Sequence, residues 1–164
     1  MNGSKKLRLE PNANLPNSSP LSVSYRANRS ILSNTEQVFY KALYQGMGNQ
    51  FLILIKVRVS DVLKPEEEGI AKQDARAATN RISSKHFDFL LCGRNQYEII
   101  AAIELDDQSN KRVGNAKYDE FLTEACKSAE FPLIRIATKQ SYAAQEIKAA
   151  VLSGLKEYRM KKAA

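Results

Sequence analysis

Apolar and polar residues alternate most regularly in two neighbouring stretches in the middle of the chain, residues 85–92 and 97–106. A period of two is typical of a β-strand that packs one face on a core. The polar residues 93–96 between the stretches favour a turn, so the sequence predicts a hairpin. The alternating apolar positions are Phe87, Phe89 and Leu91 in the first stretch and Ile99, Ala101, Ile103 and Leu105 in the second.

Apolar residues at helical spacing predict three further segments. The first begins at a capping-box sequence, residues 33–36, and reaches Gly46; the others cover residues 118–129 and 143–158. Strands are predicted at 51–59 and 132–136, and a short helix at 71–80 follows the break at 65–69. This order predicts an α/β fold: a mixed four-stranded sheet flanked by helices, with an extra C-terminal helix.

Length and charge suggest one folded domain between basic ends. The chain has 164 residues, 43% of them hydrophobic, which excludes a mostly disordered protein. Residues 1–30 carry a net charge of +4 and residues 156–164 carry +3, so residues 31–155 are neutral. We therefore expect a flexible basic arm at 1–30, a folded domain at 31–158 and a basic tail at 159–164. The charged ends favour either nucleic-acid binding or simple solvation, with equal weight.

The chain shows no membrane segment, since its longest aliphatic run, residues 51–55, is far too short to cross a bilayer. The first residues lack the apolar stretch of a secretory signal, which predicts a cytoplasmic protein with reduced thiols. Cys92 and Cys126 are then expected to be buried as small apolar residues. Two cysteines and one histidine are also too few for a zinc finger.

Carboxylates gather on the polar side of the predicted hairpin. If the apolar residues of both strands share one face, only even register sums are allowed. A sum of 192 places Asp88 across from Glu104 and His86 across from Asp106, whereas a sum of 190 makes Asp88 and Glu104 diagonal neighbours. Crowded carboxylates favour a hard divalent cation such as Mg²⁺ or Mn²⁺. The alternative is that Asp106 merely ends a strand and Asp88 pairs with Lys85 or Arg81.

Glu36 is a fourth acidic candidate, and two interpretations carry equal weight. Its position after Ser33 fits a capping box, which is a local structural role. On a helical wheel it also lies with Phe39, Tyr40 and Leu43, so its carboxylate could point along the sheet toward the hairpin.

Residues 85–92, 103–107 and 117–122 together resemble an uncharacterised bacterial domain family of the PD-(D/E)xK, restriction-endonuclease-like nuclease superfamily. The resemblance covers about residues 32–136 and includes residues 35–40 and 56–63. It implies an αβββαβ core in which Asp88, Glu104 and Glu36 hold Mg²⁺. Asp106 stands where the superfamily has lysine, and Asn110 where similar sequences often have histidine. Lys56, Lys85 or His86 could supply the missing group, with Lys56 the first choice.

These features predict a metal-dependent nuclease that hydrolyses phosphodiester bonds of DNA. Asp88, Glu104, Asp106 and Glu36 would bind metal, and the catalytic set would be Asp88, Glu104, Asp106, Lys56 and His86. Nucleic-acid contacts are expected from Lys85, Asn110, Lys111 and Arg112. The alternative is an inactive nuclease-like module that binds nucleic acid or a protein partner. A small-molecule enzyme lacks support, because the chain has no glycine-rich phosphate loop and no nucleophile elbow.

Overall fold

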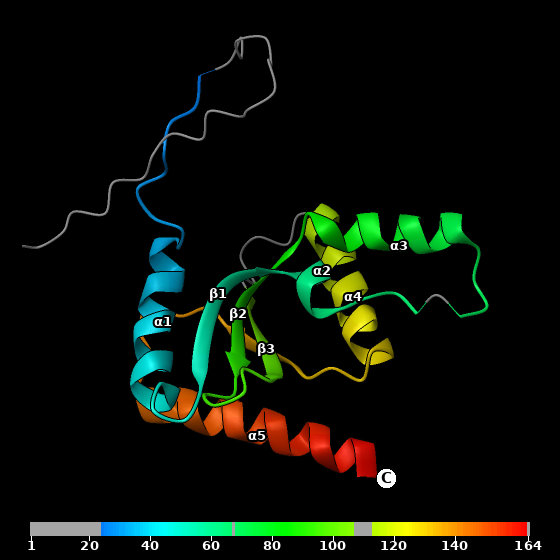
Figure 1. Ribbon diagram of the computed structural model, residues 1–164. Coiled ribbons are helices and arrows are strands. Elements are labelled where there is room, and N and C mark those ends of the chain that lie inside the picture. Colours follow the sequence, from blue (N-terminus) through cyan, green and yellow to red (C-terminus); the bar gives the residue numbers. More distant parts are fainter. Residues whose placement is uncertain (1–23, 67, 107–112, 164) are drawn as a thin grey trace, which may run out of the picture.

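A computed structural model describes residues 24–66, 68–106 and 113–163 of the chain, with the side chains of residues 113–119 left out of the description. Figure 1 shows helices and strands in close succession along these residues. The helices are α1 (Asn34–Met47), α2 (Val59–Val62), α3 (Lys72–Ser83), α4 (Val113–Ser128) and α5 (Ala144–Ala163). The strands are β1 (Leu52–Arg58), β2 (His86–Cys92), β3 (Ile99–Asp106) and β4 (Leu133–Ala137).

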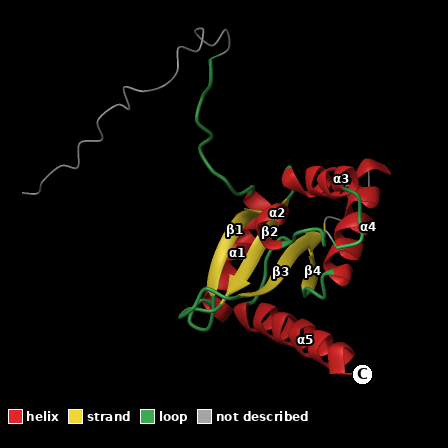
Figure 2. Cartoon of the chain, turned by 45° about the vertical axis from the view of Figure 1, so that its right-hand side comes forward, coloured by secondary structure: helices red, strands yellow, loops and turns green. Residues whose placement is uncertain are grey.

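The four strands form one mixed sheet in the order β1-β2-β3-β4 (Figure 2). The pairs β1–β2 and β2–β3 are antiparallel, whereas β3 and β4 are parallel and joined through α4. One core cluster contains residues of α1, α5 and the sheet, and a second contains residues of α2, α3, α4 and the sheet. The predicted fold class, a mixed four-stranded α/β sheet flanked by helices with a C-terminal helix, is therefore confirmed.

The predicted hairpin forms in the register with sum 192 over part of its length. Phe89 pairs with Ile103, Leu90 with Ala102 and Leu91 with Ala101, before the register shifts at Cys92. Beyond Phe89 and Ile103 the two strands are no longer paired with each other: β2 continues along β1, and β3 continues along β4. The expected pairing of His86 with Asp106 is wrong for this reason.

The face of the sheet to which alternate side chains point also changes, in both β1 and β2, close to the point where β2 and β3 separate. Phe89 belongs to the core beneath α1 and α5, whereas Phe87 belongs to the opposite core and contacts Phe131, with ring centroids 5.9 Å apart. In β1 the same change separates Ile55 from Val57, and the residue between them, Lys56, has φ of +52°. The prediction that Phe87 and Phe89 share a face is thus wrong: the change of face falls at Asp88 in β2, at the same level as Lys56 in β1, and neither of these two residues appears among the ladder partners of the two strands.

Helix α1 begins as its capping box predicts. The Ser33 hydroxyl accepts a hydrogen bond from the backbone N–H of Glu36, and the Glu36 carboxylate accepts one from the backbone N–H of Ser33. Helix α2 replaces the end of the predicted 51–59 strand, and α5 continues to Ala163, so the basic residues from Arg159 onward are helical. Among the described residues, no helix combines the length and the apolar character required to cross a bilayer.

The predicted burial of both cysteines is confirmed. Cys92 and Cys126 are free thiols in the core between the sheet and α4, with 2% and 1% of their surfaces exposed. Burial raises the pKa of the Cys126 thiol to about 12, and the nearby Glu104 carboxylate adds to this effect. Both thiols therefore act as small apolar side chains, since a reactive cysteine requires an accessible thiolate.

Candidate functional site

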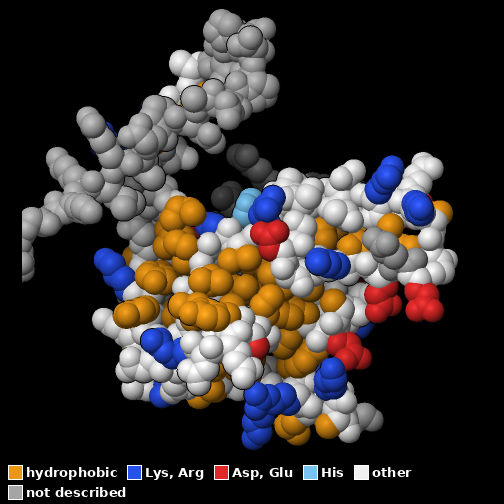
Figure 3. Space-filling model, viewed as in Figure 1, with side chains coloured by type: hydrophobic (Ala, Val, Ile, Leu, Met, Phe, Trp, Pro, Cys, Tyr) orange, Lys and Arg blue, Asp and Glu red, His pale blue; other side chains and the backbone are white. Residues whose placement is uncertain are grey.

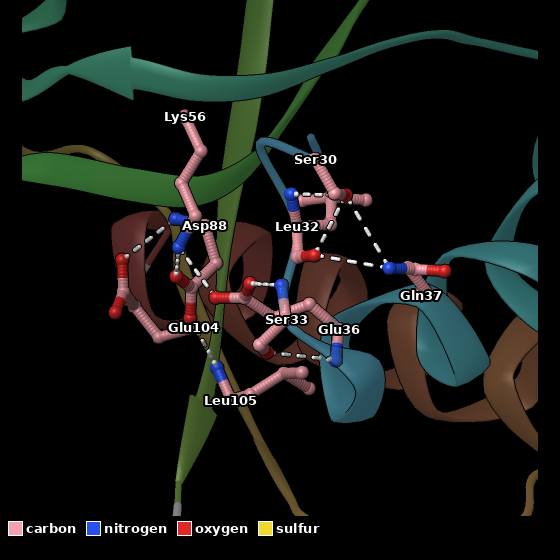
Figure 4. Close-up of polar contacts among 9 residues, drawn as sticks. All are labelled: Ser30, Leu32, Ser33, Glu36, Gln37, Lys56, Asp88, Glu104 and Leu105. Atoms are coloured by element: carbon pink, nitrogen blue, oxygen red, sulfur yellow. Dashed lines mark hydrogen bonds and ion pairs between the residues drawn. The ribbon is translucent and has the colours of Figure 1, made fainter. Parts of the chain in front are cut away.

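The candidate site lies where β2 and β3 separate, and carboxylates replace the missing ladder bonds there. Glu104 Oε1 accepts a hydrogen bond from the backbone N–H of Asp88 at 3.2 Å. In return, Asp88 Oδ2 accepts one from the backbone N–H of Leu105 at 3.1 Å (Figure 4). Unpaired backbone N–H groups inside a protein are costly, so this exchange stabilises the open fork. It also fixes the Asp88 and Glu104 carboxylates next to each other.

Lys56 reaches into this fork from β1. Its Nζ lies 2.7 Å from Asp88 Oδ1 and 2.5 Å from Glu36 Oε1, so one ammonium group joins two carboxylates (Figure 4). Burial lowers the pKa of Lys56, but the hydrogen bonds with Asp88 and Glu36 outweigh it and hold the pKa above 10.5. The left-handed backbone of Lys56 costs on the order of 1–3 kcal/mol, a type of strain that is common at functional sites.

Glu36 performs both roles that the sequence left open. Its Oε2 accepts the capping hydrogen bond from the Ser33 N–H at 2.7 Å, while its Oε1 binds Lys56. Burial raises the pKa of Glu36, yet the hydrogen bonds from Lys56 and Ser33 leave it below the ordinary value of 4.5. The helix cap therefore positions a charged carboxylate beside the lysine.

Glu104 is the only charged residue among the buried residues of the described chain, with 8% of its surface exposed. Burial and then the neighbouring Asp88 charge raise its pKa to about 8. None of the ion pairs formed by the described residues includes Glu104. The hydrogen bond that Glu104 accepts within the described part of the chain reaches Oε1, from the backbone N–H of Asp88. Glu104 thus adds a buried carboxyl group to a cluster in which two carboxylates, Glu36 and Asp88, share the one ammonium of Lys56.

Asp106 faces a different partner. Arg135, on β4, donates from Nη1 to Asp106 Oδ1 at 2.7 Å and from Nη2 to Thr123 Oγ1 at 3.1 Å. The Asp106 side chain is 38% exposed. Its position two residues after Glu104 brings it near the fork, but its carboxylate is held by the arginine.

The remaining sequence candidates are more peripheral. His86 is exposed at the start of β2, opposite Arg58, and Lys85 precedes it. Asn110, Lys111 and Arg112, the expected nucleic-acid contacts, lie outside the described residues. The alternative pairing of Asp88 with Arg81 is wrong, because the Arg81 guanidinium lies over the Phe121 ring, 4.2 Å from its centroid, while Asp88 binds Lys56.

The donors at the fork fit a hard divalent ion in one specific way. No group of three Asp, Glu, His or Cys side chains is placed as a complete ligand set within the part of the chain that the structure describes. Mg²⁺, however, is usually bound by one or two protein carboxylates, with waters and substrate phosphate filling the other positions. Asp88 and Glu104 supply such a pair. Glu36 is better described as the residue that holds Lys56.

Sequence reasoning found Glu36, Lys56, Asp88 and Glu104 but missed Arg135. Arg135 is the basic residue of the predicted strand 132–136, and the predicted strand 97–106 carries Glu104 and Asp106. If these two strands pair, the opposite charges lie close together, and this signal could have identified Arg135. In the register of β3 and β4, Arg135 lies opposite Glu104, but its guanidinium donates to Asp106, two residues further along β3.

Together, the fold and the site define an α/β protein with a carboxylate and lysine cluster at an opening between two sheet strands. The family model described as "Protein of unknown function (DUF2726)" matches residues 28–154, and the chain belongs to this family. The matched range includes every residue of the cluster. No curated protein and no solved structure matches the chain.

Proposed function

We propose that the protein is a metal-dependent nuclease that hydrolyses phosphodiester bonds of DNA at the fork between β2 and β3. The observation that carries the proposal is the pair of adjacent carboxylates, Asp88 and buried Glu104, beside a lysine held 2.7 Å from Asp88. The Glu36 and Asp88 carboxylates share the single ammonium of Lys56, which leaves the cluster short of positive charge. A divalent cation would correct this imbalance in the presence of an anionic substrate.

Each side chain has a distinct role in this proposal. Asp88 and Glu104 would hold Mg²⁺ or Mn²⁺, which supplies charge neutralisation and acidifies a water molecule for attack on phosphorus. Lys56 would stabilise negative charge developing on the phosphoryl oxygens. Glu36 would be a positioning residue, because it fixes the ammonium group through Oε1 while Ser33 fixes its other oxygen. The protein itself would thus supply rigid geometry, since each of these groups is tied to the backbone or to a neighbour.

The raised pKa of Glu104 links metal binding to proton release. With a pKa of about 8, Glu104 is largely protonated at pH 7 and must lose this proton to bind a cation. Titration calorimetry with Mn²⁺ in buffers of different ionisation enthalpy should therefore show release of a proton at pH 7. The same measurement at pH 9 should show much less release.

Cleavage assays test the activity directly. We expect labelled DNA to be cut in the presence of Mg²⁺ or Mn²⁺ by the wild type, and cleavage to fall by at least about a thousandfold in both Asp88→Asn and Glu104→Gln, by analogy with other groups that stabilise transition-state charge. Asp61→Asn is the matched control, because Asp61 lies on helix α2, is exposed and pairs with Arg58 at the end of β1. Equal cleavage by wild type and Asp88→Asn would contradict the proposal, and labelled RNA in parallel reports the substrate class.

A second candidate is an inactive nuclease-like module that binds nucleic acid or a protein partner. The observation that favours it is the position of Lys56 Nζ, which already bridges Glu36 and Asp88 and partly neutralises them. This candidate predicts salt-sensitive retention of DNA without cleavage and without any effect of Mn²⁺ on the unfolding temperature.

We further propose that the protein works in the cytoplasm. The support is chemical: Cys92 and Cys126 are free, buried and unpaired with each other, as is usual where thiols are kept reduced.

A further inference from the structure

A pocket of about 510 Å³ lies beside the edge strand β4, apart from the fork. Its walls come from the C-terminal half of α4, the connection to β4, the first residue of β4 and the C-terminal end of α5. Figure 2 shows β4 between these two helices. We call this space, lined by residues within 123–133 and 158–162, the β4 pocket. Pockets of this volume are typical of sites for small molecules.

The walls of the β4 pocket are connected to one another. Arg135 Nη2 donates to Thr123 Oγ1 at 3.1 Å, which ties α4 to β4. Lys162 Nζ lies 2.7 Å from Glu130 Oε2 and links the end of α5 to the residues that follow α4. A ligand therefore meets walls that are already in place, which lowers the free-energy cost of binding.

The charged residues of the β4 pocket favour an anion. Lys127, Lys161 and Lys162 line it, and Glu130 is the one acidic residue among the described residues that do so, which gives a net charge of +2. Lys162 is occupied by Glu130, whereas neither Lys127 nor Lys161 forms an ion pair with a described residue. Two ammonium groups at the pocket are thus free to bind a negative ligand.

The kind of basic residue and the amount of charge favour a phosphomonoester. Carboxylates are best held by the planar fork of arginine, whereas lysine binds phosphate as a point charge. All basic residues among the described lining residues are lysines. A phosphomonoester carries a charge of about −1.5 to −2 at pH 7, which matches the net charge of the pocket, and a carboxylate carries less.

The remaining walls favour a flat, aromatic ligand body. Cys126 and Leu133 provide apolar surface, and aromatic rings come from two separate segments, Phe131 before β4 and Tyr158 on α5. Both rings are partly buried. Aromatic side chains stack on nucleobases whatever the identity of the base. Figure 3 shows Lys and Arg side chains gathered around the C-terminal part of α5, beside apolar side chains.

We propose that the β4 pocket binds a nucleoside monophosphate, with the base against Phe131 and Tyr158 and the phosphate on Lys127 and Lys161. The inference is independent of the proposed nuclease activity, because no residue of the carboxylate cluster lines this pocket. The 5′-phosphorylated end of a DNA strand presents the same chemical groups, so the experiment compares a free nucleotide with such an end.

Titration calorimetry of the full chain with dAMP and dTMP, in buffer without divalent cations, tests the proposal. We expect both nucleotides to bind, and Lys127→Met and Lys161→Met each to weaken binding about tenfold, because each removes a charged contact to phosphate. Tyr158→Leu should also weaken binding, since it removes a stacking ring. Lys156→Met is the matched control, an exposed lysine of α5 outside the pocket, and should bind as the wild type does. Circular dichroism verifies that the variants fold.

Fragments of the ligand separate the contributions of base and phosphate. Deoxyadenosine and inorganic phosphate should each bind much more weakly than dAMP, and 3′,5′-cyclic AMP, which has one negative charge, should bind several-fold more weakly. Tighter binding of a 5′-phosphorylated trinucleotide would support the site and identify a strand end as its ligand. The proposal is overturned if neither nucleotide binds up to roughly 1 mM, if deoxyadenosine binds as tightly as dAMP, or if Lys161→Met binds as Lys156→Met does.

Discussion

Lys56 and Asp88 lie opposite each other at the level where β1 and β2 both change the core that they face. Ile55 pairs with Phe89 and Val57 pairs with Phe87, so Lys56 and Asp88 fall between these pairs, with Lys56 Nζ 2.7 Å from Asp88 Oδ1. The positive φ of Lys56 and the ion pair thus occur together. A strained backbone residue persists only when its surroundings hold it in place, and the two carboxylates do so here.

Replacement of Lys56 by methionine should separate stability from metal affinity. Lys56→Met keeps the length of the side chain but leaves two carboxylates, Glu36 and Asp88, without their ammonium, so we expect a loss of about 1–3 kcal/mol in the free energy of unfolding at pH 7. Added Mn²⁺ should restore part of this loss, because a cation can replace the ammonium. Urea unfolding with and without Mn²⁺ measures both effects.

The control for this variant is Lys41→Met, at an exposed position of α1. Methionine and lysine have similar helix propensities, so its stability should stay within about 0.5 kcal/mol of the wild type. Since the pKa of Lys56 is held above 10.5, the ion pair is complete at any lower pH, and the difference between the variants should not change between pH 7 and pH 9. A Lys56→Met protein as stable as the control would contradict the bridging role.

Glu104 should make the protein less stable as the pH rises. The folded protein keeps the Glu104 proton up to a pKa of about 8, whereas the unfolded chain loses it near 4.5. Unfolding between these values releases a proton, so the free energy of unfolding falls with increasing pH across this window, in total by on the order of 5 kcal/mol. Glu104→Gln, which cannot ionise, should lack this part of the decrease.

Urea unfolding from pH 5 to pH 9 measures the difference between wild type and Glu104→Gln. Glu124→Gln, a change at an exposed position of α4, should follow the wild-type profile. Parallel profiles for the wild type and Glu104→Gln would show that Glu104 ionises normally in the folded protein.

Replacement by asparagine should reduce the affinity for Mn²⁺ much more at Asp88 than at Asp106. Asp106→Asn removes an ion pair with Arg135 in which the two side chains are 38% and 24% exposed, so we expect a loss of stability of at most about 1 kcal/mol. Because the arginine holds the Asp106 carboxylate, the affinity for Mn²⁺ should change only a few-fold. Asp88→Asn should abolish measurable Mn²⁺ binding in the same calorimetric titration. Equal losses of affinity in both variants would place Asp106 among the metal ligands.

Gly46 on α1 should not tolerate alanine, although alanine favours helices. A Cβ atom at Gly46 would lie 2.6 Å from the backbone oxygen of Ala144, at the start of α5. Helix propensity alone would stabilise the variant by about 1 kcal/mol, but the overlap forces α1 and α5 apart, so we expect Gly46→Ala to destabilise the protein by about 1–3 kcal/mol. Thermal unfolding followed by circular dichroism gives the sign of the change. A higher unfolding temperature would show that the two helices separate at no cost.

Local sequence patterns were sufficient for much of the fold. The capping box of α1 and the helical periodicity of α4 and α5 act within one or two turns, so sequence spacing alone reveals them. The need to bury Phe89, Leu91, Ala101 and Ile103 together restricted the hairpin to even register sums, and the structure has the sum of 192 rather than 190. The same reasoning failed at Phe87, because strict alternation assumes an unbroken ladder, and the ladder of β1 and β2 is interrupted at Lys56 and Asp88.

By itself, the sequence determined the α/β class, the order of the elements and the acidic residues that lie near each other on the hairpin. Those features depend on periodicity and on short connections, which are local properties. Only the tertiary structure decided the partner of each charge: Lys56 with Glu36 and Asp88, and Arg135 with Asp106. These partners lie 20 to 32 residues apart along the chain. Ion pairs have no sequence period, so they are fixed only when separate strands and helices pack side by side.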